Sequence, residues 1–329
     1  MNILLLGQYA PELIEALRHS HKIVQVESGP IDRALADAEI IVMRSDLDLT
    51  ARHIAAAPDL QLIIKAGSGF DNIDMEAARR RGVEVDAAPG GTQAVAEHAV
   101  TMLLAAWRET QFMSDELRAG NWSVKYRRIG LNFDRVPLGI LGFGRIGRRT
   151  AQLASALGFS ILIHDHNPNT PEKIITANAV RGTFVPLATL LERSQALSIH
   201  LPLSDDTRLL LGGRELSLLP RGAVLVNTAR AEIVARGPLI EALRSGAIRS
   251  AALDVYHHEP VDRDDELLKL PNVLCTPHIG SQTLDAMNTI AELILARIAE
   301  FERCQEEVDE TVRRSQIRVG NDNVSFVHD

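Results

Sequence analysis

The chain has few cysteines, few aromatic residues and no excess of basic residues. Only Cys275 and Cys304 occur among 329 residues, too few for a disulfide framework, and neither stands in a CxxC motif or in a metal-ligand spacing with histidine. We therefore expect a reducing compartment, the cytoplasm, and a site without metal. A formal net charge of −8 excludes a general nucleic-acid or membrane-surface binder, which needs a basic footprint.

No apolar run is long enough to cross a membrane, and residues 1–7 are typical of a first strand rather than of a signal peptide. A hydrophobic content of 46% with only 4% aromatic residues suits an aliphatic α/β core, and the length suits two domains. Short apolar runs alternate with helical segments along the chain. The predicted strands are residues 3–6, 23–26, 40–43, 62–65, 83–86, 138–141, 159–164, 196–200, 223–227, 250–254 and 273–276.

A glycine-rich turn joins an apolar strand to a helix, with Gly142, Gly144 and Gly147 spaced as GxGxxG. The first glycine permits the tight turn, the second lets backbone approach a pyrophosphate, and the third lets the helix pack against the strand. The next strand runs into Asp165, eighteen residues after Gly147, where an acid can bind both ribose hydroxyls and would repel a 2′-phosphate. Although such a turn alone can serve only chain geometry, this context predicts a dinucleotide site that favours NAD over NADP.

These patterns predict an α/β protein of two doubly wound parallel-sheet domains, in which a Rossmann NAD-binding domain is inserted into a flavodoxin-like substrate domain. We expect the substrate domain to comprise residues 1–92 plus 285–329, and the NAD-binding domain residues 93–284. A long helix over 94–108 connects them. A final helix is predicted from Leu284 to about Arg303. The tail from Glu306 is expected to be loose, with an edge strand over 324–327 as the alternative.

Four short segments place polar residues at the carboxyl ends of predicted strands, where open α/β sheets bind ligands. In the first, the small residues Gly67, Ser68 and Gly69 expose backbone N–H groups that suit a carboxylate. A plain strand-to-helix turn capped by Asp71 or Asn72 explains the same segment.

The other three segments carry Arg230, Glu259 and His278. An arginine at the end of an apolar strand can bind a carboxylate in bidentate geometry, although a surface arginine is the simpler interpretation. A histidine there can donate a proton to a carbonyl oxygen as hydride reaches the carbon, which reduction of a 2-keto acid requires. Glu259 would fix its tautomer. The alternative is a structural histidine, one of eleven in the chain.

In this order, the glycine motif, Asn-Thr-Ala-Arg at 227–230, Leu-Asp-Val and Glu-Pro within 253–260, and Thr-Pro-His-Ile-Gly at 276–280 resemble the D-isomer-specific 2-hydroxyacid dehydrogenases. The resemblance implies an NAD-dependent oxidoreductase that transfers hydride between nicotinamide and a small anionic D-2-hydroxy or 2-keto acid, working as a homodimer. It makes Arg230 the ligand of the substrate carboxylate, and His278 the general acid and base. Glu259 orients and charges His278.

The resemblance also implies the remaining contacts. The NAD-binding residues would be Ser68, Gly142, Gly144, Arg145, Ile146, Gly147, Asp165, Leu201, Pro202, Thr228, Ala229, Asp254 and Ser281. The substrate-binding residues would be Arg44, Gly67, Ser68, Gly69 and Arg230. The arm that contains Trp107 and Trp122 resembles the dimer contact region of the family.

The chain departs from the family pattern at two places. Ala231 and Glu232 follow Arg230 where the family has glycine and then an acidic helix start, so backbone freedom there is reduced. The loop 89–93 lacks an asparagine that the family carries. Substrate identity depends on basic residues expected near the cleft. Arg44, Lys125, Arg127 and Arg128 could form a second anion site for 3-phosphoglycerate. If these residues are solvated surface charges instead, the substrate would be glyoxylate, hydroxypyruvate or a bulkier keto acid.

Two other classes of function are compatible with the motifs. One is an NADH-responsive binding protein of the same fold with little catalysis. The other is a nucleotide-dependent hydrolase on a similar fold, which would hold NAD without net consumption.

Overall fold

The chain folds into two compact units. The computed structural model describes residues 1–45, 47–126 and 131–321. The first unit comprises Met1–Ser68, Ile73–Gly90 and the chain from Met287, and the second comprises Gly69–Asn72 and Gly91–Ala286. Gly69–Asn72 belongs with the second unit, where Asp71 forms an ion pair with Arg230.

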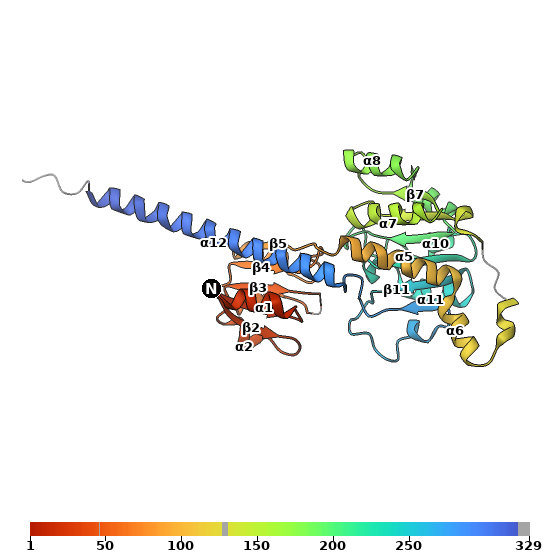
Figure 1. Cartoon of the computed structure of the whole chain (residues 1–329), viewed down its shortest axis with the longest axis horizontal. Helices are drawn as coiled ribbons and strands as arrows, with labels where there is room; N and C mark the ends of the chain where they lie inside the picture. Colours follow the sequence, from red (N-terminus) through yellow and green to blue (C-terminus); the bar gives the residue numbers. More distant parts are fainter. Residues whose placement is uncertain (46, 127–130, 322–329) are drawn as a thin grey trace, which may run out of the picture. The chain divides into compact units, whose positions relative to one another are not determined.

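The first unit is built on a five-stranded parallel sheet, drawn in red to orange in Figure 1. Its order, β2-β1-β3-β4-β5, is the flavodoxin-like one that the sequence predicts. Ile3 of β1 lies opposite Ile23 and Ile40 in the two neighbouring strands. The strands are β1 (Asn2–Leu6), β2 (Lys22–Val26), β3 (Ile40–Met43), β4 (Leu62–Lys65) and β5 (Glu84–Ala87).

Helices cover this sheet and supply its core. They are α1 (Pro11–Arg18), α2 (Asp32–Leu35), α3 (Ala51–Ala55), α4 (Met75–Arg80) and most of α12 (Leu284–Asn321). Ile290, Ile294 and Ile298 of α12 are spaced by four, so they lie on one face, where they join Leu13 and Leu17 of α1 in an apolar cluster. Burial of each such side chain stabilises the unit by about 2 kcal/mol.

The cap of α4 differs from the alternative weighed for its sequence. The carboxylate of Asp74 accepts the Ala77 N–H at 2.8 Å. Asp74 directly precedes the helix, which begins at Met75, so Asp71 and Asn72 stand too early to cap it. Asp71 is thereby left to contact Arg230.

The last helix is longer than the sequence predicts. Helix α12 runs to Asn321 and extends beyond the sheet of its own unit (Figure 1). The prediction of a loose segment from Glu306 is therefore wrong as far as residue 321. Residues 305–318 contain neither proline nor glycine, and Glu, Gln and Arg have favourable helix propensities. The edge strand considered for 324–327 lies outside the described residues.

The second unit is built on a seven-stranded parallel sheet. Its order, β12-β11-β10-β9-β6-β7-β8, is the Rossmann order with one further strand, so the predicted doubly wound α/β fold is confirmed. The order reverses at β6, where such sheets bind ligands beyond the carboxyl ends of the strands. The strands are β6 (Pro137–Leu141), β7 (Ser160–His164), β8 (Thr183–Phe184), β9 (Ala196–Ile199), β10 (Ala223–Asn227), β11 (Ile248–Leu253) and β12 (Val273–Cys275).

Helices lie on both faces of the second sheet. One apolar cluster joins it to α5 and α7, and another joins it to α9, α10 and α11. The helices are α5 (Thr92–Arg108), α6 (Thr110–Arg118), α7 (Arg145–Ala156), α8 (Pro171–Ala179), α9 (Leu187–Arg193), α10 (Gly213–Ser217) and α11 (Arg236–Arg244). Short 3-10 turns are η1 (Trp122–Tyr126), η2 (Phe133–Arg135), η3 (Ala231–Ile233) and η4 (Leu267–Lys269).

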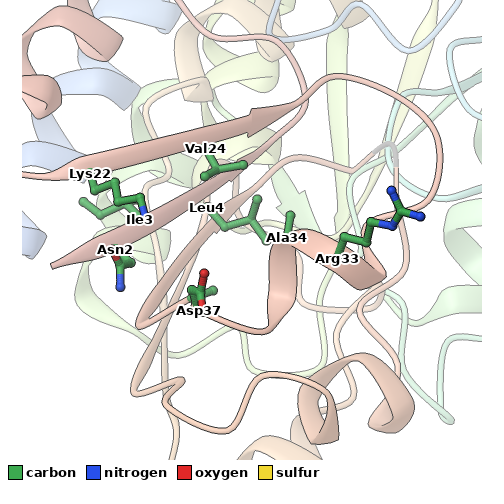
Figure 2. Close-up of a pocket in the computed structure, with 9 residues that line it drawn as sticks. Asn2, Ile3, Leu4, Lys22, Val24, Arg33, Ala34 and Asp37 are labelled. Carbon is green, nitrogen blue, oxygen red and sulfur yellow. The ribbon is translucent and has the colours of Figure 1, made fainter.

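Three further features concern the surface. Among the described residues, no helix combines the length and apolar character needed to span a bilayer. Those residues also contain no cluster of three or more side chains placed to hold a metal ion. A cavity of about 270 Å³ opens beside β1, β2 and α2 (Figure 2). None of the predicted site residues lines it. Its lining is Asn2, Ile3, Leu4, Lys22, Val24, Arg33, Ala34, Asp37 and Ala38.

Candidate active site

The glycine-rich turn connects β6 to α7, where the strand order reverses. Gly142 has a φ of 93°, and a Cβ there would lie 2.8 Å from the His200 carbonyl oxygen. A Cβ on Gly147 would lie 2.0 Å from the Gly142 carbonyl oxygen. The fold itself therefore requires both glycines. Gly144, the N-cap of α7, has no described atom within 4 Å of its Cβ position, which leaves room for a phosphate at the helix start.

The two kinds of glycine should respond differently to alanine. We expect Gly144→Ala to fold normally and to weaken NADH binding by about tenfold, because its Cβ would enter space reserved for the ligand. Gly147→Ala should lower the free energy of unfolding by about 1–3 kcal/mol through overpacking. Fluorescence titration with NADH and thermal melts measure both effects. Gly237→Ala, whose Cβ meets no described atom within 4 Å, is the control. Unchanged NADH affinity in Gly144→Ala would contradict a phosphate site there.

Asp165 follows β7, and its buried carboxylate already accepts several hydrogen bonds. Oδ2 accepts the Phe143 N–H at 2.7 Å, while Oδ1 accepts the Asn167 N–H at 2.8 Å and Lys173 Nζ at 2.7 Å. Burial acts to raise the pKa of Asp165, but these hydrogen bonds, led by that from Lys173, outweigh it and hold the pKa below its usual value. An ionised carboxylate has about four acceptor positions. Capacity therefore remains for one ribose hydroxyl rather than for the two expected.

The segment after β9 packs against the glycine turn. His200 Nε2 lies 2.8 Å from Ser198 Oγ. Burial lowers the pKa of His200 to about 3, so its ring is neutral. Leu201 and Pro202 follow directly, and Leu201 N lies 2.9 Å from the Cβ position of Gly142. The stretch predicted to lie beside the adenosine half of NAD is thus held at the turn.

After β10, Asn227 shapes the turn that carries three predicted site residues. Its Oδ1 accepts the Ala229 N–H at 3.0 Å, and its Nδ2 donates to the Arg230 carbonyl oxygen at 2.9 Å. Thr228 Oγ1 is buried without a hydrogen-bond partner among the described residues. Because an unpaired buried hydroxyl costs free energy, a bound group would supply its partner. This hydroxyl and the open space at Gly144 both fit NAD.

Arg230 is held in a fixed orientation by Asp71. Nε donates to Asp71 Oδ2 at 2.8 Å and Nη2 donates to Oδ1 at 2.9 Å, so the side edge of the guanidinium is occupied. Nη1 donates to the Ala229 carbonyl oxygen at 2.7 Å. One hydrogen on each of Nη1 and Nη2 is left to donate to a carboxylate. A Cβ on Gly69 would lie 2.2 Å from Arg230 Nη2, so a larger residue there would force the Arg230 side chain to move.

His278 and Glu259 form a direct pair. His278 Nδ1 donates to Glu259 Oε2 at 2.7 Å, and Glu259 Oε1 accepts the Tyr256 N–H at 2.9 Å. Burial acts to raise the pKa of Glu259, but the hydrogen bond and charge of His278, with a contribution from Arg230, hold the pKa below its usual value. Because Nδ1 faces the carboxylate, Nε2 is the ring nitrogen left to exchange a proton with a ligand. The charge of Arg230 also acts on Glu259.

His278 has an unusual backbone conformation, and the carboxylate of Asp254 stabilises the residues that follow it. His278 has a φ of 53°, a left-handed conformation that costs free energy in a non-glycine residue. The carboxylate of Asp254 accepts the Ile279 N–H and the Gly280 N–H, each at 2.9 Å. Asp254 therefore fixes the two peptide groups that follow the histidine and sets the direction of its side chain.

Asp254 in turn receives hydrogen bonds from α5 and from the end of β12. Thr276 Oγ1 donates to Oδ1 at 2.6 Å, and His98 Nε2 lies 3.4 Å from the same oxygen. Only 1% of the Asp254 side chain is exposed. Burial acts to raise the pKa of Asp254, but the hydrogen bonds from His98, Thr276 and Ile279 outweigh burial and hold the pKa below its usual value. Asp254 is thus kept ionised where it accepts the N–H groups of Ile279 and Gly280.

Three predicted residues belong to the first unit: Arg44, Gly67 and Ser68. Arg44 follows β3, and its Nη1 donates to the Gln8 carbonyl oxygen at 3.4 Å. Lys65 is buried at the end of β4 and donates to the Arg44 carbonyl oxygen at 2.9 Å. Gly67 has a φ of 150°, a conformation that favours glycine. The loop after β4 therefore depends on this glycine for its path.

The basic residues considered as a second anion site have separate surroundings. Lys125 lies in η1 of the second unit, with Nζ 4.9 Å from the ring centre of Trp122 and 4.8 Å from that of Tyr126. Cation–π contacts of this kind hold the ammonium over the rings. Arg127 and Arg128 lie outside the described residues.

The two departures from the family pattern have structural reasons. Ala231 begins η3, is buried, and is not among the residues with positive φ, so alanine fits there without strain. In the loop 89–93, a Cβ on Gly90 would lie 2.7 Å from Ile290 N. A Cβ on Gly91 would lie 2.9 Å from that of Ser281. The close approach of Ile290 and Ser281 therefore explains the two glycines in this loop.

Sequence reasoning missed three residues of this site: Asp71 as the partner of Arg230, His98 beside Asp254, and Lys173 beside Asp165. Lys173 left a local signal, because it is the third residue of α8 and a cation in the first turn opposes the helix dipole. Another group must hold it there. The other two contacts join segments far apart in the chain and left no local signal.

Comparison with known proteins gives consistent results. The profile of the family described as "D-isomer specific 2-hydroxyacid dehydrogenase, NAD binding domain" matches residues 100–280. A glyoxylate reductase from Aeropyrum pernix is 37% identical over 308 residues, covering 88% of this chain and 90% of that protein. A D-3-phosphoglycerate dehydrogenase from Archaeoglobus fulgidus is 35% identical over 299 residues, covering 89% of this chain and 56% of that protein. The chain thus spans little more than half the length of the latter relative.

Among solved structures, D-lactate dehydrogenase from Aquifex aeolicus, complexed with NAD and lactic acid, superposes with a TM-score of 0.82 and 28% identity. The match covers 92% of this chain and 97% of that one. The likeness therefore extends over both units.

Proposed function

Because the chain belongs to the D-isomer specific 2-hydroxyacid dehydrogenase family, we propose that it transfers hydride between NAD(H) and C2 of a D-2-hydroxy acid or its 2-keto acid. The observation that carries this proposal is the His278–Glu259 hydrogen bond in the NAD-binding unit, with Arg230 near enough to lower the pKa of Glu259. A proton-exchanging ring beside a carboxylate-binding guanidinium supplies the two groups that keto-acid reduction needs.

Each residue has a defined task in this proposal. NADH supplies the hydride when it is bound. Nη1 and Nη2 of Arg230 bind the substrate carboxylate, while Asp71 keeps them aimed. His278 Nε2 donates a proton to the keto oxygen during reduction and removes it from the hydroxyl during oxidation. Glu259 accepts the Nδ1 hydrogen and holds the ring in one orientation.

The chain's own groups also account for binding of the cofactor. We propose that the pyrophosphate lies over Gly144 against the first N–H groups of α7, those of Arg145 and Ile146. Asp165 would accept one ribose hydroxyl, and Thr228 Oγ1 would find its missing partner near the nicotinamide. The N–H of Gly69, in the same unit as Arg230, would bind the other side of the substrate carboxylate. The first unit is proposed as the substrate-binding domain.

We propose a small 2-keto acid, such as glyoxylate or hydroxypyruvate, as the substrate. A relative named glyoxylate reductase is 37% identical, and this chain covers 90% of its length. 3-Phosphoglycerate has less support, because its phosphate needs several cations and Lys125 contacts two aromatic rings.

The proposal is tested by following NADH absorbance with glyoxylate, hydroxypyruvate, phosphohydroxypyruvate, and branched and aromatic 2-keto acids. Fast turnover of glyoxylate or hydroxypyruvate would support it. Preference for phosphohydroxypyruvate would overturn the substrate assignment but keep the reaction. Tight NADH binding without turnover of any acid would contradict the reaction and favour an NADH-responsive binding protein.

Glu259→Gln should lower kcat for keto-acid reduction by about tenfold. Glu259 accepts the Nδ1 hydrogen of His278 at 2.7 Å, which leaves Nε2 to face the ligand. The pKa of Glu259 lies below its usual value, so the carboxylate is charged through the neutral range, and this contact is lost only as pH falls through the lowered pKa. The wild-type rate should therefore fall at acid pH, and the variant should lack that fall. An unchanged kcat would contradict the pairing, and Glu266→Gln is the control.

We further propose that the protein is a cytoplasmic homodimer. The arm of α6 and η1 exposes Leu117, Trp122 and Tyr126 by 54%, 68% and 73%, and large apolar side chains gathered on one arm favour an interface. Light scattering should give twice the chain mass, and Trp122→Glu should lower that value. A monomeric wild-type protein would contradict the dimer.

The cytoplasmic location is supported by the scarcity of cysteine, with both thiols free, which suits a reducing compartment. Cell fractionation tests the location.

A further inference from the structure

A partly buried lysine contacts the carboxylate that is proposed to bind the ribose. Lys173 Nζ donates to Asp165 Oδ1 at 2.7 Å and to the Asn167 carbonyl oxygen at 2.7 Å. Only 13% of the Lys173 side chain and 5% of the Asp165 side chain are exposed. The ammonium is therefore fixed within hydrogen-bond distance of the group that selects NAD over NADP. Nothing in the reaction itself requires a cation at this position.

The charge of this corner differs from that of an isolated acid. Asp165 carries one negative charge and Lys173 one positive charge, so the pair is neutral overall. His166 is the other titratable neighbour, with Nδ1 3.7 Å from Asp165 Oδ1, but its side chain is 90% exposed and is screened by solvent. The start of α7 adds a partial positive charge. Only the Asp165 carboxylate would thus repel a 2′-phosphate here, and the Lys173 ammonium is already bound to that carboxylate.

We propose that Lys173 is a second determinant of cofactor choice, whose ammonium becomes a ligand for the 2′-phosphate of NADP(H) once Asp165 no longer holds it. This inference deepens the proposed function and rests on it. An ammonium has three donors. Two are engaged, by Asp165 and by Asn167, and loss of the carboxylate would leave a second one to turn toward the ribose. A phosphate carries about two negative charges and binds such donors strongly.

The contact with Asn167 keeps the ammonium in place when Asp165 is changed. The acceptor is a backbone carbonyl oxygen, so substitution of Asp165 does not remove it. Lys173 also lies in the first turn of α8 (Pro171–Ala179), which limits how far its stem can swing. Asp165→Ser should therefore create a phosphate site without any added arginine or lysine.

The test measures dissociation constants of NADH and NADPH by protein fluorescence, together with kcat/KM for one keto acid with each cofactor. The variants are Asp165→Ser, Lys173→Met and the double variant. Lys173→Arg in the Asp165→Ser background keeps the charge, and Lys269→Met removes a surface lysine from its pair with Asp264 as the control. Thermal melts establish that each variant folds.

Asp165→Ser should tighten NADPH binding by at least about tenfold, and adding Lys173→Met should remove most of that gain. Lys173→Arg should retain the gain, and Lys269→Met should leave both affinities unchanged. An equal gain with and without Lys173, or no gain in Asp165→Ser, would overturn the proposal. Binding is measured without turnover, so failure of the proposed reaction would appear separately, as bound cofactor without keto-acid reduction.

Discussion

Replacement of His278 by glutamine is expected to lower kcat for keto-acid reduction by about 10³-fold while NADH affinity stays within about twofold. Glutamine keeps a polar group of similar reach, but it cannot exchange a proton. His278 Nδ1 is committed to Glu259 at 2.7 Å, so Nε2 is the atom whose proton transfer is lost. The cofactor contacts proposed for Gly144, Asp165 and Thr228 do not involve this ring, and binding of NADH should therefore persist.

The measurement is single-turnover reduction with NADH already bound, which separates hydride transfer from cofactor binding. His258→Gln is the matched control, because His258 lies next to Glu259 in the sequence and is exposed. Its kcat should remain unchanged. Comparable losses in both variants would point to a disturbed loop rather than to lost proton transfer. Full activity in His278→Gln would remove the histidine from the mechanism.

The fold follows closely from local sequence. Buried parallel strands are continuous apolar runs, so Ile40–Met43, Leu62–Lys65 and Ala223–Asn227 have the same bounds in prediction and structure. The sequence also predicts that the polar residues after these strands gather at one edge, because parallel strands bring their carboxyl ends together. The spacing of Gly142 and Gly147 follows from backbone geometry, since each site would reject a Cβ.

The hydrogen-bond partners of the site residues were harder to predict from the sequence. Arg230 and Asp71 are 159 residues apart, and neither residue's neighbours favour this contact over a helix cap or a surface charge. Lys173 is only eight residues from Asp165, and its place in the first turn of α8 was a signal, but its partner depends on the path of the loop after β7. Such contacts depend on the tertiary path, which hydrophobic periodicity does not encode.

The support of His278 shows the same limit in backbone terms. A left-handed φ is uncommon outside glycine, and no motif around His278 predicts it. Asp254 offsets the cost of this conformation by accepting the N–H groups of Ile279 and Gly280. The family resemblance implies that Asp254 contacts the cofactor, and its described hydrogen bonds show in addition that it supports the loop of His278.

Arg230→Lys should lower kcat/KM for the keto acid by about 10²- to 10³-fold, although the charge is retained. Lysine has no planar fork, so it loses the bidentate contact to Asp71 and the bidentate contact proposed for the substrate carboxylate. The larger part of the loss should appear in KM, because carboxylate binding precedes hydride transfer. NADH affinity, measured by fluorescence, should change by less than about threefold.

Arg236→Lys is the matched control, since Arg236 also forms a partly buried ion pair, with Asp265 at 3.0 Å, outside the site. If it lowers kcat/KM as much as Arg230→Lys does, the effect is one of stability, and thermal melts should then show equal losses. If Arg230→Lys retains a normal KM, the carboxylate must be held elsewhere, and Arg230 would serve Asp71 rather than the substrate. Asp71 and the Ala229 carbonyl oxygen engage three of the five guanidinium hydrogens, so a ligand is left one hydrogen on each terminal nitrogen, and these outcomes are distinct.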